Sequence, residues 1–287
     1  LTGSTFLSMG TINSNAGGSL NYRKGKLGLS STLGYAVSRM RAKNTLVSDF
    51  GPGSTLDVLS QRSDARREAS SAMMQLGADY SLSKTSYLAA GFRMSVPDVT
   101  IRTDQFTTRS FARGIATTDQ RESSNRFSGT NYDINLDYTK TFKKPGRELS
   151  VLGLLSGNIR NNENFMDLYA GEGTGRRERN LNDAYNSETT IQTDYKHPIG
   201  KTQTIEVGAK SIWRYAESDF RFLVSGPADP LFVLVPGRND VFTYNQDVLA
   251  SYAMYGAKIS KYNLRVGLRY EYTWIEGDFR LKGTSVE

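Results

Sequence analysis

The sequence of 287 residues contains no cysteine and only one histidine, His197. Without cysteine, neither a disulfide framework nor a thiolate metal site can form. A single imidazole removes most zinc sites and most imidazole acid–base chemistry. The longest unbroken apolar run, residues 231–235, is far shorter than the roughly 20 residues that a membrane-spanning helix needs. We therefore expect no enzyme activity, no cofactor, no metal site and no helical membrane span.

Bulk hydrophobicity is also low, with 38% hydrophobic residues and a mean hydropathy of −0.48. Strands that cross a bilayer place apolar residues only at alternate positions, so a low average is compatible with a transmembrane barrel. Lys and Arg exceed Asp and Glu by 36 − 29 = 7, but the basic residues are spread over turns, connections and strands. No compact basic motif is present, and we expect no nucleic-acid partner.

Residues 241–278 carry the clearest pattern in the chain. One side of the second half consists of Leu264, Val266, Leu268, Tyr270, Tyr272 and Trp274, with polar residues at most positions between them. In 242–254 the even positions are mostly apolar and the odd ones mostly polar, so the even side is predicted to be the apolar side. A period of two indicates β-strands. We predict a hairpin whose strands of about fifteen residues extend on the order of 50 Å.

Four further pairs of strands follow the same pattern. The predicted pairs are 15–23 with 27–37, 72–80 with 88–96, 132–139 with 149–159, and 189–195 with 205–215. Turns within a pair are short, and the turn of the fourth pair contains His197. Connections between pairs are long and are predicted as loops: 38–71, 97–129, 160–188 and 216–240.

This alternation of short turns and long connections is typical of a transmembrane β-barrel, in which the long loops lie outside the cell. The predicted fold is therefore all-β, an antiparallel transmembrane β-barrel with about ten long meander strands. A long hairpin in a soluble sandwich or solenoid is the alternative for one pair taken alone.

Three segments resemble barrel segments of TonB-dependent outer-membrane receptors, of the outer membrane protein beta-barrel type common in Bacteroidota. They are GSLNYRKGKL at 18–27, ASYAMY at 250–255 and LRVGLRYEYT at 264–273. The resemblance implies a 22-stranded barrel whose lumen is closed by a separate plug domain. It also implies a bacterial outer-membrane location, contact with outer-membrane lipid and lipopolysaccharide, and energy supplied by the TonB complex through the plug.

Residues 1–287 are expected to form a partial barrel domain, with the plug domain and the remaining strands absent. The chain begins at Leu1 without a basic and apolar leader, and it ends at Glu287 soon after a strand. Both ends are therefore expected to be cut from a longer polypeptide.

Candidate ligand-binding residues are arginines of the predicted long loops, because guanidinium groups hold carboxylates and phosphates in bidentate geometry. These are Arg109, Arg113, Arg176, Arg177 and Arg179. They are predicted to attract an anionic ligand such as a ferric siderophore, to contact lipopolysaccharide phosphates, or to be ordinary solvated charges.

Aromatic residues at the ends of apolar strands are predicted to form a membrane girdle: Tyr270, Tyr272, Trp274, Trp213 and Tyr215. Inward-facing charges are predicted at Asp133, Asp137, Arg214, Arg265, Arg269 and Glu271, where they line a solute path or bond to one another or to the plug.

The expected function is import of a scarce nutrient of the ferric siderophore, cobalamin or oligosaccharide class. In this function the chain supplies barrel wall and extracellular loops. The alternative is a small closed ten-stranded barrel that acts as a passive pore or an adhesin. An outer-membrane protease is a further alternative, but it would need a histidine near the outer rim, and His197 is predicted at the opposite end.

Overall fold

The structure is a computed structural model that describes residues 1–51, 56–111, 114, 116–170, 173–226, 229 and 231–286. Its strands are β1 (Thr2–Ser8), β2 (Asn13–Lys24), β3 (Leu27–Asp49), β4 (Leu56–Ser83), β5 (Ser86–Phe111), β6 (Ala116–Thr141), β7 (Glu148–Ala170), β8 (Gly173–Ile199), β9 (Gln203–Ser225), β10 (Val233–Leu234), β11 (Asp240–Ile259), β12 (Tyr262–Phe279) and β13 (Thr284–Val286). No helix among the described residues is long and apolar enough to cross a membrane.

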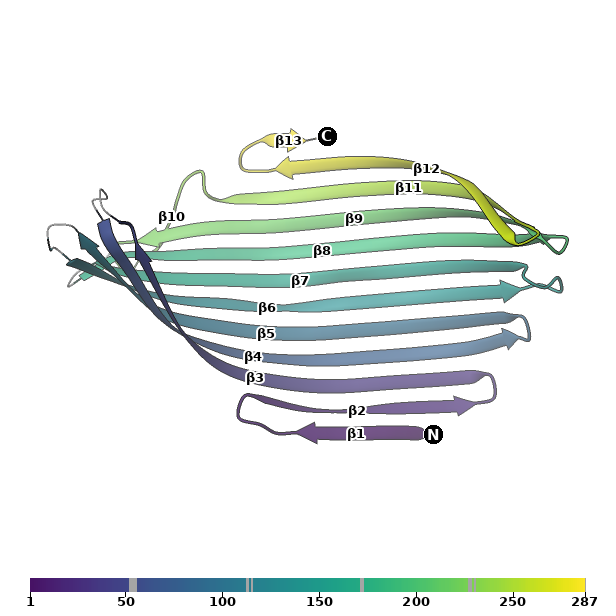
Figure 1. Cartoon of the computed structure of the whole chain (residues 1–287), viewed down its shortest axis with the longest axis horizontal. Helices are drawn as coiled ribbons and strands as arrows, with labels where there is room; N and C mark the ends of the chain where they lie inside the picture. Colours follow the sequence, from purple (N-terminus) through teal and green to yellow (C-terminus); the bar gives the residue numbers. More distant parts are fainter. Residues whose placement is uncertain are drawn as a thin grey trace.

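All these strands belong to one antiparallel sheet in which each long strand pairs with its sequence neighbours, in the order β1 to β9, then β11, β12 and β13, with β10 on the end of β9 (Figure 1). The ten predicted strands are confirmed as β2 to β9, β11 and β12. Three short strands, β1, β10 and β13, were not predicted. Short turns gather at one end of the sheet, which we call the turn end. The opposite end is called the far end (Figure 1).

The turns are short because their residues reverse the chain within a few positions. Gly25 opens the β2–β3 turn with a φ of +58°, and Ser260 has the same place and a φ of +56° in the β11–β12 turn. Positive φ at this position is what two-residue hairpin turns require. The β8–β9 turn is shorter than predicted, because β8 continues through His197 to Ile199.

The predicted long loops are wrong for three of the four connections. Strands β3 to β8 continue far past the predicted boundaries, so that β4 alone has 28 residues, or roughly 90 Å at the usual rise per residue. The connections 38–71, 97–129 and 160–188 are mostly long β-hairpins at the far end (Figure 1). In the fourth, 216–240, β9 runs to Ser225 and a loop with β10 follows.

The sheet has two faces that the register defines for every strand, because directly paired residues point to the same side. The outer face carries Leu264, Val266, Leu268 and Tyr270 of β12, and the inner face carries Arg265, Arg269 and Glu271. The six predicted inward charges all lie on the inner face.

One predicted side is wrong. The even residues of β11 were expected on the apolar side, but Tyr252 pairs with Arg269 and Ala250 pairs with Glu271, so the even side is the inner face. Val248 and Ala250 on this side are only 7% and 5% exposed, so apolar side chains are accommodated on the inner face with little contact with water.

A compact hydrophobic core is missing from the described part of the chain. Only Phe222, Val248 and Ala250 are buried apolar side chains, and the accessible surface is 19034 Å². A compact monomer of 31.9 kDa would expose roughly 12,000 Å². A single sheet with this much uncovered apolar surface must be covered by something other than the described residues.

Candidate functional site

The outer face is a continuous apolar band over the half of the sheet nearest the turns. Exposed apolar side chains lie on it in each strand from β2 to β12 apart from β10: Leu20, Leu29, Leu33, Leu76, Val96, Ile134, Leu136, Ile159, Ile191, Ile205, Val207, Leu249, Leu264, Val266 and Leu268. Leu268 is 83% exposed. Monomers in water do not expose apolar patches of this extent, so this face is suited to hydrocarbon.

Aromatic residues mark both limits of that band. The five predicted girdle residues all lie on the outer face, at the limit away from the turns or close to it. A second level lies close to the turns and was not predicted: Tyr22, Tyr80, Tyr138, Tyr195, Tyr255 and Tyr262. On β8, Tyr185 and Tyr195 are separated by 195 − 185 = 10 residues, about 33 Å along the strand and about 25 Å across a bilayer at a tilt of about 40°. This is the height of a transmembrane apolar band.

The inner face is polar, and its charged groups bond across neighbouring strands. Arg214 is held by Glu188 at 2.5 Å and donates from Nη1 to the side-chain oxygen of Gln246 at 2.9 Å. Tyr252 donates to Asp194 at 2.6 Å. Such a surface would leave several buried charges if it were covered by an apolar layer, so it faces water or a polar partner.

A surface rich in asparagine runs from the middle of β6, β7 and β8 toward the far end on the inner face. Asn131, Asn158 and Asn186 are directly paired across β6, β7 and β8, and two more rows of asparagine lie farther from the turns: Asn162 with Asn182, and Asn125 with Asn164 and Asn180. We call these eight residues the asparagine face. Two pockets open on it. One, of about 540 Å³, includes Asn158, Asn186 and Tyr244, and the other, of about 330 Å³, includes Asn162, Phe127 and Phe220.

The predicted ligand-binding arginines are not brought together. Arg109 and Arg176 lie on the inner face, where they pair with Asp119 and Glu178. Arg177 and Arg179 lie on the outer face of the same strand, β8. Arg113 lies outside the described residues.

The two outer-face arginines of β8 contact aromatic rings. Arg177 pairs with Asp167 at 3.3 Å. The guanidinium of Arg179 lies 3.9 Å from the ring centre of Phe232 and 5.0 Å from that of Phe165. Cation–π contacts of this kind fix the loop that follows β9 against the sheet.

A row of arginines crosses three strands on the outer face, and this alignment was not predicted from the sequence. Arg41, Arg66 and Arg102 are directly paired across β3, β4 and β5 on the outer face. Arg41 bonds Asp64 at 2.8 Å through Nε, and Arg102 lies 3.6 Å from Glu68, whereas Arg66 has no ion pair among the described residues. Like charges directly opposite one another on a sheet are destabilising. In this arginine row, Asp64 and Glu68 offset two of the three charges, and the charge of Arg66 is left without a carboxylate partner among the described residues.

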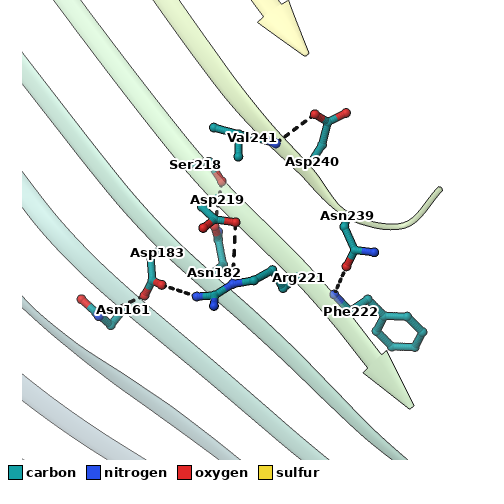
Figure 2. A network of polar contacts seen from close by, with 10 residues as sticks. All are labelled: Asn161, Asn182, Asp183, Ser218, Asp219, Arg221, Phe222, Asn239, Asp240 and Val241. Atoms are coloured by element: carbon teal, nitrogen blue, oxygen red, sulfur yellow. Dashed lines mark hydrogen bonds and ion pairs between the residues drawn. The ribbon is translucent and has the colours of Figure 1, made fainter. Parts of the chain in front are cut away.

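A polar network holds the far end of the sheet where β9, β10 and β11 meet. Figure 2 shows Arg221 of β9 reaching to Asp183 of β8 at 2.6 Å, while Asn161 of β7 donates to the same carboxylate at 3.0 Å. Asn239 accepts the backbone N–H of Phe222 at 2.7 Å. Phe222 is 1% exposed, and the Arg238 guanidinium lies over its ring. The network fixes the loop before β11 and reaches the asparagine face at Asn182, whose oxygen accepts a hydrogen bond from Ser218 at 2.7 Å.

No group of three or more His, Asp or Glu residues within the described ranges could hold a metal ion. His197 lies on the outer face near the turn end and bonds the hydroxyl of Tyr195 through Nδ1 at 3.2 Å.

Residues 140–287 match the model of the outer membrane protein beta-barrel family. The match covers 148 of 287 residues, just over half of the chain, and includes β7 to β13. No curated protein and no solved structure matches the chain.

Proposed function

The chain belongs to the outer membrane protein beta-barrel family, and from this premise we propose that it forms part of the wall of a TonB-dependent receptor that imports a scarce nutrient. The family places the chain in the bacterial outer membrane. The nutrient belongs to the ferric siderophore, cobalamin or oligosaccharide class. The chain itself has a non-catalytic role, as scaffold and as the surface that the nutrient meets.

The observation that carries this proposal is the pair of open sheet edges. On the side away from β11, β12 pairs with β13 only at residues 277–279, and β1 pairs only with β2 among the described residues. Each unpaired backbone group in hydrocarbon costs several kcal/mol. Ten long strands that still need partners at both edges support a wide barrel of the 22-stranded type, because a small barrel would pair β1 with β12.

The polar inner face supports the same proposal. A wide lumen must be filled by water or by a plug domain, and side chains such as Arg214 and Glu188 are already partnered within the wall. A plug can then move against this wall without leaving unpaired buried charges behind. The TonB complex would deliver energy through that plug.

Uptake measurements test the proposal. Cells that express the full-length receptor are given labelled members of the three nutrient classes, with and without an uncoupler and with and without TonB. We expect uptake of one class that stops when either the proton gradient or TonB is removed. Uptake that continues without both, together with a large steady conductance of the purified protein in planar bilayers, would show a passive pore and overturn the proposal.

Lipopolysaccharide is the lipid partner that we propose for the arginine row. Arg41, Arg66 and Arg102 are each 14 residues from the first apolar outer-face residue of their strands (41 − 27, 80 − 66 and 102 − 88). Fourteen residues rise about 46 Å along a strand and about 35 Å across a bilayer, above an apolar band of about 25 Å. The guanidinium groups thus lie at the level of the headgroup phosphates, which they bind in bidentate geometry.

Adjacent arginines on opposite faces provide a matched pair of variants. Arg66 faces outward, whereas Arg67 faces inward and donates to the hydroxyl of Ser38 at 3.0 Å. We expect Arg66→Glu to reduce the lipopolysaccharide retained by the purified receptor and Arg67→Glu to leave it unchanged. If both variants and the unmodified protein retain the same amount of lipopolysaccharide, Arg66 does not contribute to lipopolysaccharide binding.

A further inference from the structure

The asparagine face lies on the inner, water-facing side of the wall and presents amide groups in three rows. Each row follows the direct pairing of β6, β7 and β8, so neighbouring amides within a row are one strand spacing, about 4.8 Å, apart. The rows are Asn131–Asn158–Asn186, Asn162–Asn182 and Asn125–Asn164–Asn180. None of the eight side chains is buried.

Most of the hydrogen-bonding capacity on this face is unused. A primary amide offers two donors and an oxygen with two lone pairs. Within the face, Asn186 donates to the oxygen of Asn158 at 3.0 Å, Asn180 donates to the oxygen of Asn164 at 3.4 Å, and Asn164 donates to the oxygen of Asn125. At its borders, Asn131 donates to the hydroxyl of Ser95 at 3.2 Å, and the hydroxyl of Ser218 donates to the oxygen of Asn182 at 2.7 Å. Asn162 makes no side-chain hydrogen bond to any described residue. These bonds set the orientation of the amides and leave donors and acceptors directed at the lumen.

Aromatic rings lie at the ends of the central row. Phe127, Asn162, Asn182 and Phe220 are directly paired in that order across β6, β7, β8 and β9. Both rings line the pocket of about 330 Å³ with the amides between them. The pocket therefore combines amides, which both donate and accept, with two apolar ring surfaces. Its lining also includes Arg126, which is ion-paired with Asp98 at 2.9 Å, and Glu163.

The charge around the asparagine face argues against an anionic ligand at this position. In the neighbouring pocket of about 540 Å³, Arg214 is neutralised by Glu188, and Asp133 adds a negative charge. A phosphate or carboxylate ligand would be held by guanidinium groups, whereas here the available groups are amides.

We propose that the asparagine face, with Phe127 and Phe220, binds a neutral oligosaccharide. This inference rests on the receptor function proposed above and selects the substrate class of that receptor. A sugar hydroxyl both donates and accepts, as an amide does, so adjacent hydroxyls match adjacent amides. The apolar C–H faces of the sugar rings pack on the phenylalanine rings, which bury apolar area. Rows of amides on three neighbouring strands bind successive sugar units along the strand direction.

Binding is tested with the full-length receptor in detergent by titration calorimetry against a panel of neutral oligosaccharides, with uncharged peptides of similar length and a ferric siderophore as comparison ligands. The variant Asn162→Ala/Asn182→Ala removes two inward amides. The matched control, Asn161→Ala, removes an amide on the outer face of the same strand. Unchanged heat-modifiable migration shows that each variant folds.

We expect one oligosaccharide of the panel to bind and the double variant to weaken it about tenfold, since two neutral hydrogen bonds contribute about 0.5 to 1.5 kcal/mol each. Asn161→Ala should bind as the unmodified receptor does. Binding of peptides or siderophore but of no oligosaccharide, or equal affinity of the double variant, overturns this inference. If TonB-dependent uptake persists in that case, the receptor function stands; if no energy-dependent uptake exists, the receptor function fails as well.

Discussion

An arginine introduced at Leu268 tests which face of the sheet meets lipid. Leu268 lies six residues after Tyr262, the aromatic residue nearest the β11–β12 turn (268 − 262 = 6). Six residues rise about 20 Å along the strand and about 15 Å across the membrane at a tilt of about 40°. In a band about 25 Å tall, this position is close to the middle of the bilayer.

The expected cost follows from that depth. Arginine on the lipid face costs about 2 to 4 kcal/mol at the midplane and about 0 to 1 kcal/mol near an interface. Leu268→Arg should therefore lower the folding equilibrium constant of the full-length protein by roughly 30- to 1,000-fold. Tyr262→Arg, at the interface, should change it less than about fivefold. The assay is reversible urea unfolding in lipid vesicles.

The opposite face supplies the control. Arg269→Leu removes an exposed ion pair with Glu271, which contributes at most about 1 kcal/mol. If Leu268→Arg and Tyr262→Arg cost the same, or if Arg269→Leu is the most costly of the three, the assignment of the faces is wrong. Spin labels at 268 and 270 should contact oxygen, and labels at 269 and 271 should contact a nickel chelate.

Two further predictions concern the far-end hairpins and the packing of the outer face. The Arg41 guanidinium, which hydrogen-bonds the Asp64 carboxylate, holds the pKa of that carboxyl below its ordinary value of 3.8. The stabilisation is therefore complete above this value and is lost as pH falls through the lowered pKa. The rate of pepsin cleavage of the β3–β4 hairpin, divided by the rate for an unstructured peptide at the same pH, should rise as pH falls below 3.8, and Asp64→Asn should remove that rise. At Gly157 an added Cβ would lie 2.5 Å from the Tyr132 hydroxyl, which bonds Tyr185 at 3.2 Å. Gly157→Val should cost about 1 to 3 kcal/mol in vesicle unfolding, whereas Gly153→Val, with its nearest atom at 3.9 Å, should be tolerated; equal costs would contradict the packing argument.

The alternation of residues was enough to locate ten strands and to assign the faces of those in which the two sides differ clearly. In 132–139 and 264–274, one side must meet hydrocarbon and the other water, so the two sides differ in composition and a period of two is visible. In β11 both sides contain apolar residues, and only pairing with Arg269 and Glu271 shows which side is inward. The composition of the two sides therefore favoured the wrong one, and the register corrects the assignment.

The sequence predicted the candidate ligand-binding surface less well than the strands. Alternation predicted the inward charges, but the arginines near Arg176 were grouped because they are close in sequence, and adjacent residues of a strand point to opposite faces. The asparagine face and the arginine row each consist of residues that share one side of the sheet although they are distant in sequence. Their members, such as Asn158 and Asn186 or Arg41 and Arg66, are far apart in sequence and meet only through pairing.

By itself, the sequence determined that the chain builds bilayer-crossing strands. The side of a strand that meets hydrocarbon must be apolar, so apolar residues occur at every second position. Only the tertiary structure decided that the strands continue far beyond the apolar band as hairpins. There neither face meets hydrocarbon, no alternation is needed, and backbone pairing with neighbouring strands holds the polar segments in place. It also decided which distant side chains become neighbours, because register is a property of two strands together.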